Sequence, residues 1–186
     1  GEVLKELLFK REDWSEAFFN YPAAKGYHHA FRHGLAFHVY GMLKIAEQLI
    51  SVHKGLDLEL LVTGIILHDY GKIWEFEIDK DNISYKAEYG QTAALANHAS
   101  LLNEKLMELG FKNTKELKKL KHVISAHHEN LEWGALQKPA LPEAIIIAKI
   151  DQLDATTQGV LDSIKGIEDG GHTTQYNIAH TRLWKL

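Results

Sequence analysis

The chain carries Gly64-Ile65-Ile66-Leu67-His68-Asp69-Tyr70-Gly71-Lys72 about a third of the way along its length. An apolar run leads directly into the dipeptide His68-Asp69, where a helix of this composition is expected to be buried. A buried aspartate is costly unless it is paired or bound to a metal ion. Taken with the other histidines that recur along the chain, the dipeptide makes a buried metal site the first hypothesis and metal-assisted phosphoester hydrolysis the first chemistry to test.

Composition limits the classes of protein to which the chain can belong. Its 186 residues suit one domain with a sizeable core, and 45% of them are hydrophobic. The absence of cysteine excludes disulfides and thiolate metal sites, so any metal must be held by His, carboxylate or water. The net charge of -4 argues against a general nucleic-acid-coating protein, which would normally be basic.

The sequence has no apolar run long enough to cross a bilayer and no signal-peptide pattern at its N-terminus. We therefore expect a cytoplasmic protein with no membrane partner. The first residue is Gly1 and not Met, which fits a processed chain or a fragment of a longer one.

Hydrophobic periodicity and capping residues predict an all-α protein. Asp57 and Thr114 are expected to cap helices and Pro142 to open one. Gly71 is expected to end the helix that Asp57 caps, and Gly110 to end another. A small β-hairpin is expected near 76–85, around the turn Asp79-Lys80-Asp81-Asn82. The predicted helices span residues 3–9, 12–19, 28–52, 58–70, 89–109, 115–127 and 143–163.

Other His and Asp side chains recur at helix positions that should be buried. Neutral imidazoles and carboxylates from several helices are the ligands that a pair of divalent ions needs. Each residue taken alone is more commonly structural, but an unpaired buried polar group costs about 1–3 kcal/mol, so the whole set favours a metal site. The additional candidates are His38, His98, His127, His128 and Asp151.

The order His, His-Asp, His, His-His, Asp resembles the HD superfamily of metal-dependent phosphohydrolases, and is most similar to the YhaM-like 3′–5′ exoribonucleases. The resemblance implies one HD-domain helical bundle over 1–186, with N-terminal helices in 1–24, a metal-binding core in 25–165 and a tail in 166–186. The matching segments are 19–25, 28–31, 34–38, 64–72, 120–122, 125–128, 132–134 and 150–155.

The resemblance also implies the roles of individual side chains. Asp69 is expected to bridge two divalent ions, which would be Mn²⁺, Fe²⁺, Ni²⁺, Co²⁺ or Zn²⁺, and to be catalytic together with Lys72. Lys72 would neutralise developing charge on a phosphate, or alternatively act only as a cation at a helix C-terminus. One ion would be held by His38, His68, Asp69 and Asp151, and the other by His98, His127 and His128.

Residues outside the ligand set are candidates for binding substrate. His28, His29 and His33 precede the first ligand and would either line the cleft or pack the start of a helix. Trp133 would either stack a base or pack in the core. Asp154 is a candidate for orienting a ligand, with a solvated helix residue as the alternative.

Three functions follow in order of preference. The first is a 3′–5′ exoribonuclease acting on a single-stranded RNA 3′ end, and the second is a phosphohydrolase of small or cyclic nucleotides. The third is a non-catalytic HD-fold binding module. The exoribonucleases carry an N-terminal OB-fold for which this chain has no room, so we expect an excised catalytic domain or a stand-alone enzyme. The oligomeric state is left open.

Overall fold

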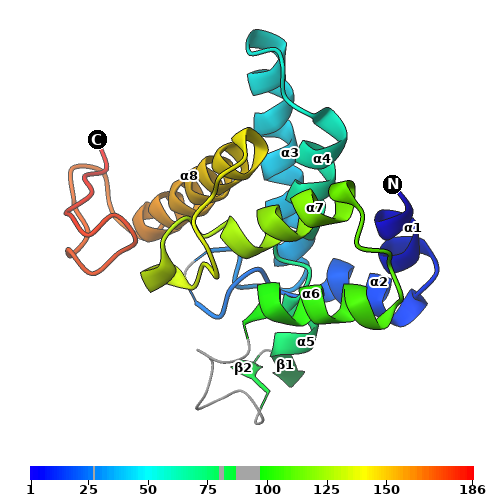
Figure 1. Cartoon of the computed structure of the whole chain (residues 1–186). Helices are drawn as coiled ribbons and strands as arrows, with labels where there is room; N and C mark the ends of the chain where they lie inside the picture. Colours follow the sequence, from blue (N-terminus) through cyan, green and yellow to red (C-terminus); the bar gives the residue numbers. More distant parts are fainter. Residues whose placement is uncertain (27, 80–81, 87–96) are drawn as a thin grey trace.

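The structure is a computed structural model that describes residues 1–186 apart from 27, 80–81 and 87–96. It is mostly helical, with one two-stranded antiparallel sheet, which confirms the predicted fold class (Figure 1). The elements are α1 (Glu2–Phe9), α2 (Glu12–Asn20), α3 (Gly34–Val52), α4 (Leu58–Leu67), α5 (Lys72–Glu75), β1 (Phe76–Asp79), β2 (Asn82–Tyr85), α6 (His98–Glu108), α7 (Lys115–Ala126), the 3₁₀ turn η1 (Leu131–Trp133) and α8 (Pro142–Ile164).

The predicted helix caps are confirmed. The Asp57 carboxylate accepts a hydrogen bond from the Leu60 backbone N–H at 3.1 Å, and the Thr114 hydroxyl accepts one from Leu117 at 3.2 Å. Pro142 is the first residue of α8, where its missing N–H costs nothing. These caps fix where α4, α7 and α8 begin, and two of these helices lead into predicted ligands at their C-terminal ends.

The predicted start of the third helix at His28 is wrong, because α3 begins at Gly34. His29 and His33 have φ angles of 47° and 71°, in the left-handed region that interrupts a right-handed helix. A Cβ at position 34 would overlap the carbonyl oxygen of His29. The loop therefore packs tightly against the first residue of α3, with the His29 carbonyl beside Gly34.

The predicted helix over residues 58–70 is also shorter, because α4 ends at Leu67. Gly71 has φ −62° and so is not a left-handed terminator; it precedes the short helix α5 instead. A Cβ at Gly71 would overlap the backbone of His98. The glycine is needed for this close approach, which places the start of α6 beside the end of α4.

The hairpin expected near 76–85 is confirmed, with Phe76 paired to Tyr85 and Asp79 paired to Asn82. Two residues of its predicted turn, 80 and 81, lie outside the described residues. The helix predicted over 89–109 is described only from α6 onward, since 87–96 lie outside as well.

The core lies where α8 packs against α3, α4 and α7, and Figure 1 shows α7 lying beside both α4 and α8. Gly64 allows this packing, since a Cβ there would lie 2.6 Å from Ile147 of α8 and 2.8 Å from Val123 of α7. The Tyr70 hydroxyl donates to the Leu7 carbonyl at 2.7 Å and anchors α1. Fully buried core residues include Leu35, Met42, Leu61, Ile65, Leu67, Leu102, Leu106, Ile124 and Ile147.

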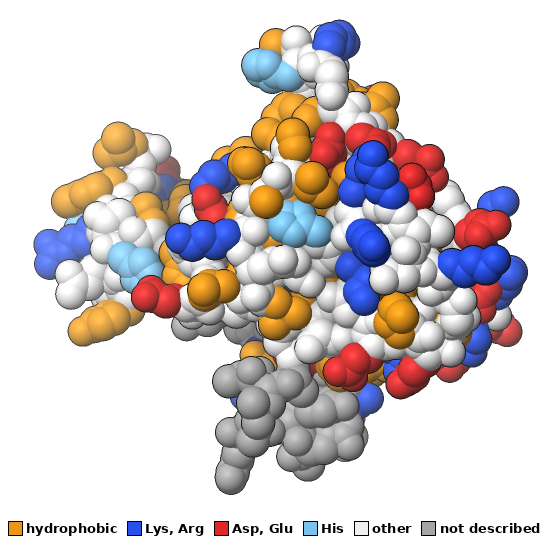
Figure 2. All heavy atoms as spheres, in the orientation of Figure 1, with side chains coloured by type: hydrophobic (Ala, Val, Ile, Leu, Met, Phe, Trp, Pro, Cys, Tyr) orange, Lys and Arg blue, Asp and Glu red, His pale blue; other side chains and the backbone are white. Residues whose placement is uncertain are grey.

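Two surface properties bear on binding partners. Figure 2 shows acidic and basic side chains interspersed on the face it presents, without one continuous basic surface there. None of the helices in the described part of the chain has both the length and the apolar character needed to cross a membrane.

Candidate metal centre

All seven predicted ligands converge in the interior of the protein. They come from separate elements: His38 from the middle of α3, Asp151 from α8, and His98 from the first turn of α6. The remaining ligands follow the C-terminal ends of two helices, His68 and Asp69 after α4 and His127 and His128 after α7. In six of the seven, no more than 15% of the residue or of its side chain is exposed to solvent. These six are His38, His68, Asp69, His98, His127 and Asp151.

The ligands form two groups, in each of which the potential donor atoms lie within 4.8 Å of one another. This grouping matches the division that the family resemblance implies, except that Asp69 is counted in the second group. The first group is His38, His68 and Asp151, and the second is Asp69, His98, His127 and His128.

The Asp69 carboxylate lies between the two groups. Its Oδ1 is 3.2 Å from His98 Nε2 and 3.6 Å from His127 Nε2, both in the second group. Its Oδ2 is 3.4 Å from His68 Nε2 and 4.0 Å from His38 Nε2, both in the first group. Each oxygen therefore faces a different group, which is the arrangement that a bridging carboxylate requires.

Hydrogen bonds fix the orientation of the imidazole rings. The Nδ1 atoms of His68 and His127 lie 2.7 Å from the carbonyl oxygens of Ile65 and Ile124. A carbonyl can only accept, so each Nδ1 carries the proton and each Nε2 presents its lone pair to the centre. Metal-binding histidines are commonly held in this way, with the second ring nitrogen donating to a carbonyl or carboxylate.

Carboxylates play the same part for the other two buried rings. His98 Nδ1 donates to Glu75 at 3.1 Å, and His38 Nδ1 donates to Asp154 at 2.7 Å. The Nε2 atoms of His98 and His127 then face each other at 3.2 Å. Two lone pairs at this separation repel unless a proton or a cation lies between them.

Several atoms at the centre lack a hydrogen-bond partner among the described residues, although they are buried. They include His38 Nε2, His68 Nε2 and Asp69 Oδ1. Buried polar atoms are almost always satisfied in native proteins, so these three point to a ligand. Nitrogen and carboxylate oxygen donors suit first-row divalent ions. The residues present therefore fit a two-ion site.

The protonation states of three of the candidate ligands fit metal binding. Burial lowers the pKa of His128 to about 2 and lowers that of His127, so both rings are neutral near pH 7. Burial would raise the pKa of Asp69, but the positive charge of the Lys72 ammonium is the largest opposing effect and holds that pKa well below its ordinary value. Asp69 is consequently a carboxylate, with charge available for cations.

Lys72 contacts the Asp69 carboxylate directly. It opens α5, and its Nζ donates to Asp69 Oδ2 at 2.6 Å and to the Ala23 carbonyl at 2.5 Å. The residue is only 8% exposed. An ammonium has three donors, so these two bonds leave one N–H for a further acceptor.

The four predicted substrate-binding residues occupy different environments. The ring centroids of His28 and His29 lie 5.5 Å and 5.4 Å from that of His38. His29 is buried against Asp154, whereas the ring of the exposed His33 lies 2.7 Å from the Phe19 carbonyl oxygen. Trp133 is 57% exposed on η1. Their roles in substrate binding stay predictions.

Two residues at the site escaped the sequence interpretation. Glu75 is buried and holds His98; its signal is an acid between the aromatic residues Trp74 and Phe76. Asn97 caps α6 and donates at 2.5 Å to the Gly134 carbonyl, which ties the loop after His128 to the start of α6. An Asn immediately before a helix is a recognisable cap, but the boundary at His98 was not predicted.

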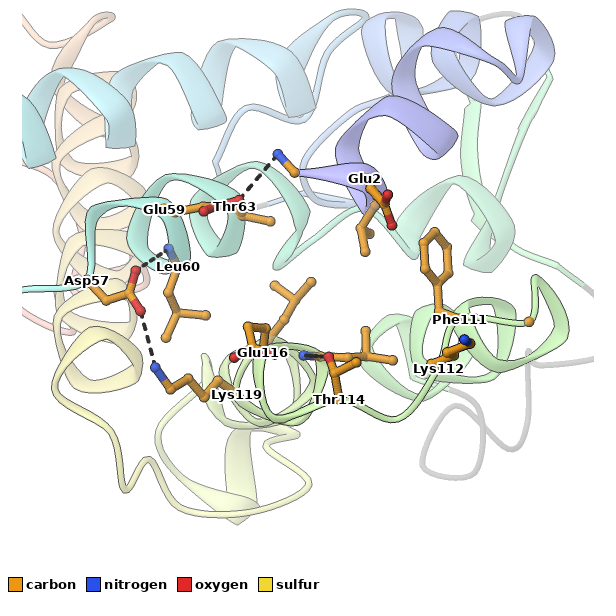
Figure 3. Close-up of a pocket in the computed structure, with 15 residues that line it drawn as sticks. Glu2, Asp57, Glu59, Leu60, Thr63, Phe111, Lys112, Thr114, Glu116 and Lys119 are labelled. Atoms are coloured by element: carbon orange, nitrogen blue, oxygen red, sulfur yellow. Dashed lines mark hydrogen bonds and ion pairs between the residues drawn. The ribbon is translucent and has the colours of Figure 1, made fainter.

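A pocket of about 570 Å³ lies elsewhere, between the N-terminus and the helices α4 and α7 (Figure 3). Its walls include Glu59, Lys119 and Phe111, and none of its lining residues is a predicted ligand. The candidate metal centre is therefore separate from this pocket.

The comparisons with known proteins agree with this geometry. Residues 35–156 match the family model of the HD domain, and this range contains all seven predicted ligands. The chain belongs to the HD domain family. This confirms the resemblance to the HD superfamily of metal-dependent phosphohydrolases that the spacing of His and Asp suggested.

Curated relatives of this HD domain carry the name 3′-5′ exoribonuclease YhaM. The protein from Halalkalibacterium halodurans is 38% identical over 90% of this chain and 51% of its own length. The protein from Bacillus pumilus is 33% identical over 92% of this chain and 53% of its own length. The protein from Bacillus subtilis is 35% identical over 84% of this chain and 49% of its own length. The chain thus spans about half the length of the curated relatives it matches. No solved structure gives a significant match.

Proposed function

We propose that this HD domain is a two-metal phosphodiesterase that removes nucleotides from the 3′ end of single-stranded RNA. The observation that carries the proposal is the Asp69 carboxylate, whose two oxygens face two separate groups of metal-binding side chains. Two ions sharing a carboxylate are typical of enzymes that cleave phosphoesters by in-line displacement.

The proposed ligands are those of the two groups. One ion would be held by His38, His68 and Asp151, and the other would be held by His98, His127 and His128. Asp69 would contact both ions. When bound, such ions supply Lewis acidity and a water activated at neutral pH. The donor set of five imidazoles and two carboxylates suits Mn²⁺, Fe²⁺, Co²⁺, Ni²⁺ or Zn²⁺, and we propose Mn²⁺ as the first ion to test.

The chain's own residues would orient the substrate around this centre. Lys72 keeps Asp69 charged and in place, and its remaining N–H would bind a phosphate oxygen. Burial lowers the pKa of His28 to about 4, so this ring is neutral near pH 7. His28 would therefore exchange a hydrogen bond with the substrate and would not act as a cation toward its phosphate.

An RNA substrate is supported by the relatives named as 3′-5′ exoribonucleases and by the position of Trp133. Gly134 follows Trp133, and a Cβ on that glycine would lie 3.3 Å from His128 Nδ1, so this loop borders the second group. The exposed Trp133 indole on this loop would stack on a base of the single strand.

The test is digestion of 5′-labelled single-stranded RNA in the presence of each candidate ion. We expect a ladder that shortens from the 3′ end with Mn²⁺, and no digestion after treatment with a chelator. Lack of 3′ shortening with every ion would reject the exoribonuclease. Hydrolysis of cyclic or small nucleotides in the same experiment would favour the alternative substrate, with which the net charge of -4 is compatible.

A further inference from the structure

Asp154 lies outside both groups of proposed metal ligands. It follows Asp151 by three residues on α8, so the two carboxylates share one face of the helix. Its Oδ2 lies 2.7 Å from His38 Nδ1 and also 2.7 Å from His29 Nε2. One oxygen therefore accepts hydrogen bonds from two imidazole rings.

The bond to His38 determines which nitrogen of that ring is available. Because a carboxylate accepts, His38 Nδ1 carries a proton, and Nε2 is the ring nitrogen that would bind a metal ion after losing its own proton. That Nε2 lies 3.2 Å from Asp151 Oδ1 and faces the first group. If the ring turned or changed tautomer, the first group would lose one of its nitrogen donors.

The bond to His29 restrains the carboxylate itself. His29 is only 2% exposed, and its carbonyl oxygen accepts a hydrogen bond from the Ala23 backbone at 3.1 Å. Its φ of 47° is unfavourable for a non-glycine residue. The loop before α3 therefore adopts a strained conformation while His29 reaches Asp154.

Gly41 completes this arrangement from α3. It lies three residues after His38, and a Cβ at this position would overlap Asp154 Oδ1. The carboxylate is thus enclosed by two histidines and by the backbone of α3, and only a residue without a side chain leaves room for it.

We propose that Asp154, restrained by His29 and accommodated by Gly41, is a positioning residue that orients His38 for the first metal ion. This inference rests on the proposed metal centre. His29, His38 and Asp154 also lie close enough to form a small metal site of their own. We favour hydrogen bonding, because 2.7 Å is an N–H···O distance and His38 would otherwise have to ligate through both nitrogens.

The test is titration of the purified, metal-free chain with Mn²⁺ by calorimetry, which reads affinity and stoichiometry without activity. The wild type should bind two ions. Asp154→Asn should lower the affinity for one ion by about 10–100-fold, the range typical of losing a hydrogen-bond partner of a metal-binding histidine. The affinity for the other ion should stay at its wild-type value. Asp162→Asn, an exposed change of the same chemistry on α8, is the matched control.

Gly41→Ala provides a second, independent variant. Alanine is the better residue inside a helix by about 1 kcal/mol, so a folding defect in the helix is not expected. The added methyl should displace Asp154 and weaken the same ion as Asp154→Asn. Circular dichroism would check that each variant keeps the helical content of the wild type.

The outcomes separate the two proposals. Wild-type affinity for both ions in Asp154→Asn, or an equal loss of both, would overturn the positioning role while the metal centre stands. A third ion in the wild type that is lost in Asp154→Asn would overturn it in favour of a metal site. A wild type that binds no Mn²⁺ would reject the proposed centre together with this inference.

Discussion

Asp69 is the residue on which both groups of ligands depend, because each of its oxygens faces one of them. We predict that Asp69→Ala abolishes hydrolysis and weakens the binding of both metal ions. The change also leaves the Lys72 ammonium buried without its carboxylate, which should destabilise the fold by about 3–5 kcal/mol. Enzyme assays, Mn²⁺ titration and urea denaturation measure the three effects.

The double variant Asp69→Ala/Lys72→Met separates chemistry from folding. Removing the unpaired Lys72 ammonium should restore much of the lost stability, since Met is an apolar residue of similar size. Activity should stay absent. Recovery of hydrolysis in the double variant, or two bound ions in the single variant, would contradict the bridging role.

His38 makes metal binding depend on pH. Burial lowers its pKa, but the adjacent carboxylates of Asp151 and Asp154 outweigh burial and raise that pKa to about 9. Because the folded pKa lies above the ordinary value of 6.5, this ring stabilises the metal-free fold below pH 6.5, and that contribution is lost as the pH rises through about 9. A metal ion must displace the same proton.

We therefore predict that loading with metal releases protons at pH 7.5 and that affinity rises between pH 6.5 and 9. Calorimetric titration in two buffers of different ionisation enthalpy would count the protons. Identical heats in the two buffers would show that His38 is already neutral in the metal-free protein.

At the scale of elements, the contact between Gly71 and the start of α6 places the end of α4 beside His98. We predict that Gly71→Ala destabilises the fold by about 1–3 kcal/mol, because a Cβ there overlaps backbone that cannot move easily. It should also weaken the ion held by His98. Gly26→Ala is the matched control, since a Cβ at Gly26 meets no atom within 4 Å. Urea denaturation and Mn²⁺ titration would compare the two variants.

The turn η1 allows a test of substrate binding that leaves the fold intact. Trp133→Ala should leave stability unchanged, because the side chain is 57% exposed, and should weaken RNA binding by about 1–3 kcal/mol, the value of one stacked base. Trp184→Ala removes a tryptophan of the same exposure, 58%, from the C-terminal tail. Fluorescence anisotropy with labelled RNA would measure both, and equal effects would argue against stacking by Trp133.

The elements whose ends carry capping chemistry could be predicted from the sequence. Asp57, Thr114 and Pro142 fixed three helix starts, and apolar runs leading into His68, His127 and Asp151 indicated the buried centre. The division of ligands into two groups came from the family resemblance, since periodicity does not show which helices meet.

The remaining features depend on contacts between distant segments. The start of α3 at Gly34 follows from left-handed backbone at His29 and His33, which no local pattern signals for histidine. The role of Gly71 depends on the backbone of His98, and that of Glu75 on the ring of the same residue. Sequence separation hides the roles of Gly71 and Glu75 from an interpretation based on neighbouring residues.

At the scale of the whole molecule, the proposed ligands connect the middle of α3 to α8 through the ends of α4 and α7. We predict that metal loading stabilises the fold, by about 2.7 kcal/mol for each site when the free ion is at 100 times its dissociation constant. Urea denaturation with Mn²⁺ and with a chelator would measure the difference. Equal transitions under both conditions would contradict metal binding by the folded protein.

This stabilisation has a particular meaning for a chain that has no cysteine. Such a chain cannot form a disulfide, yet its ligands run from His38 to Asp151 and so enclose most of the sequence. Bound ions would act as reversible cross-links that close this long loop and hold its ends together. Removing metal would then do more than stop hydrolysis: it would loosen the protein as reduction loosens a disulfide-bonded one, and expose it to proteases.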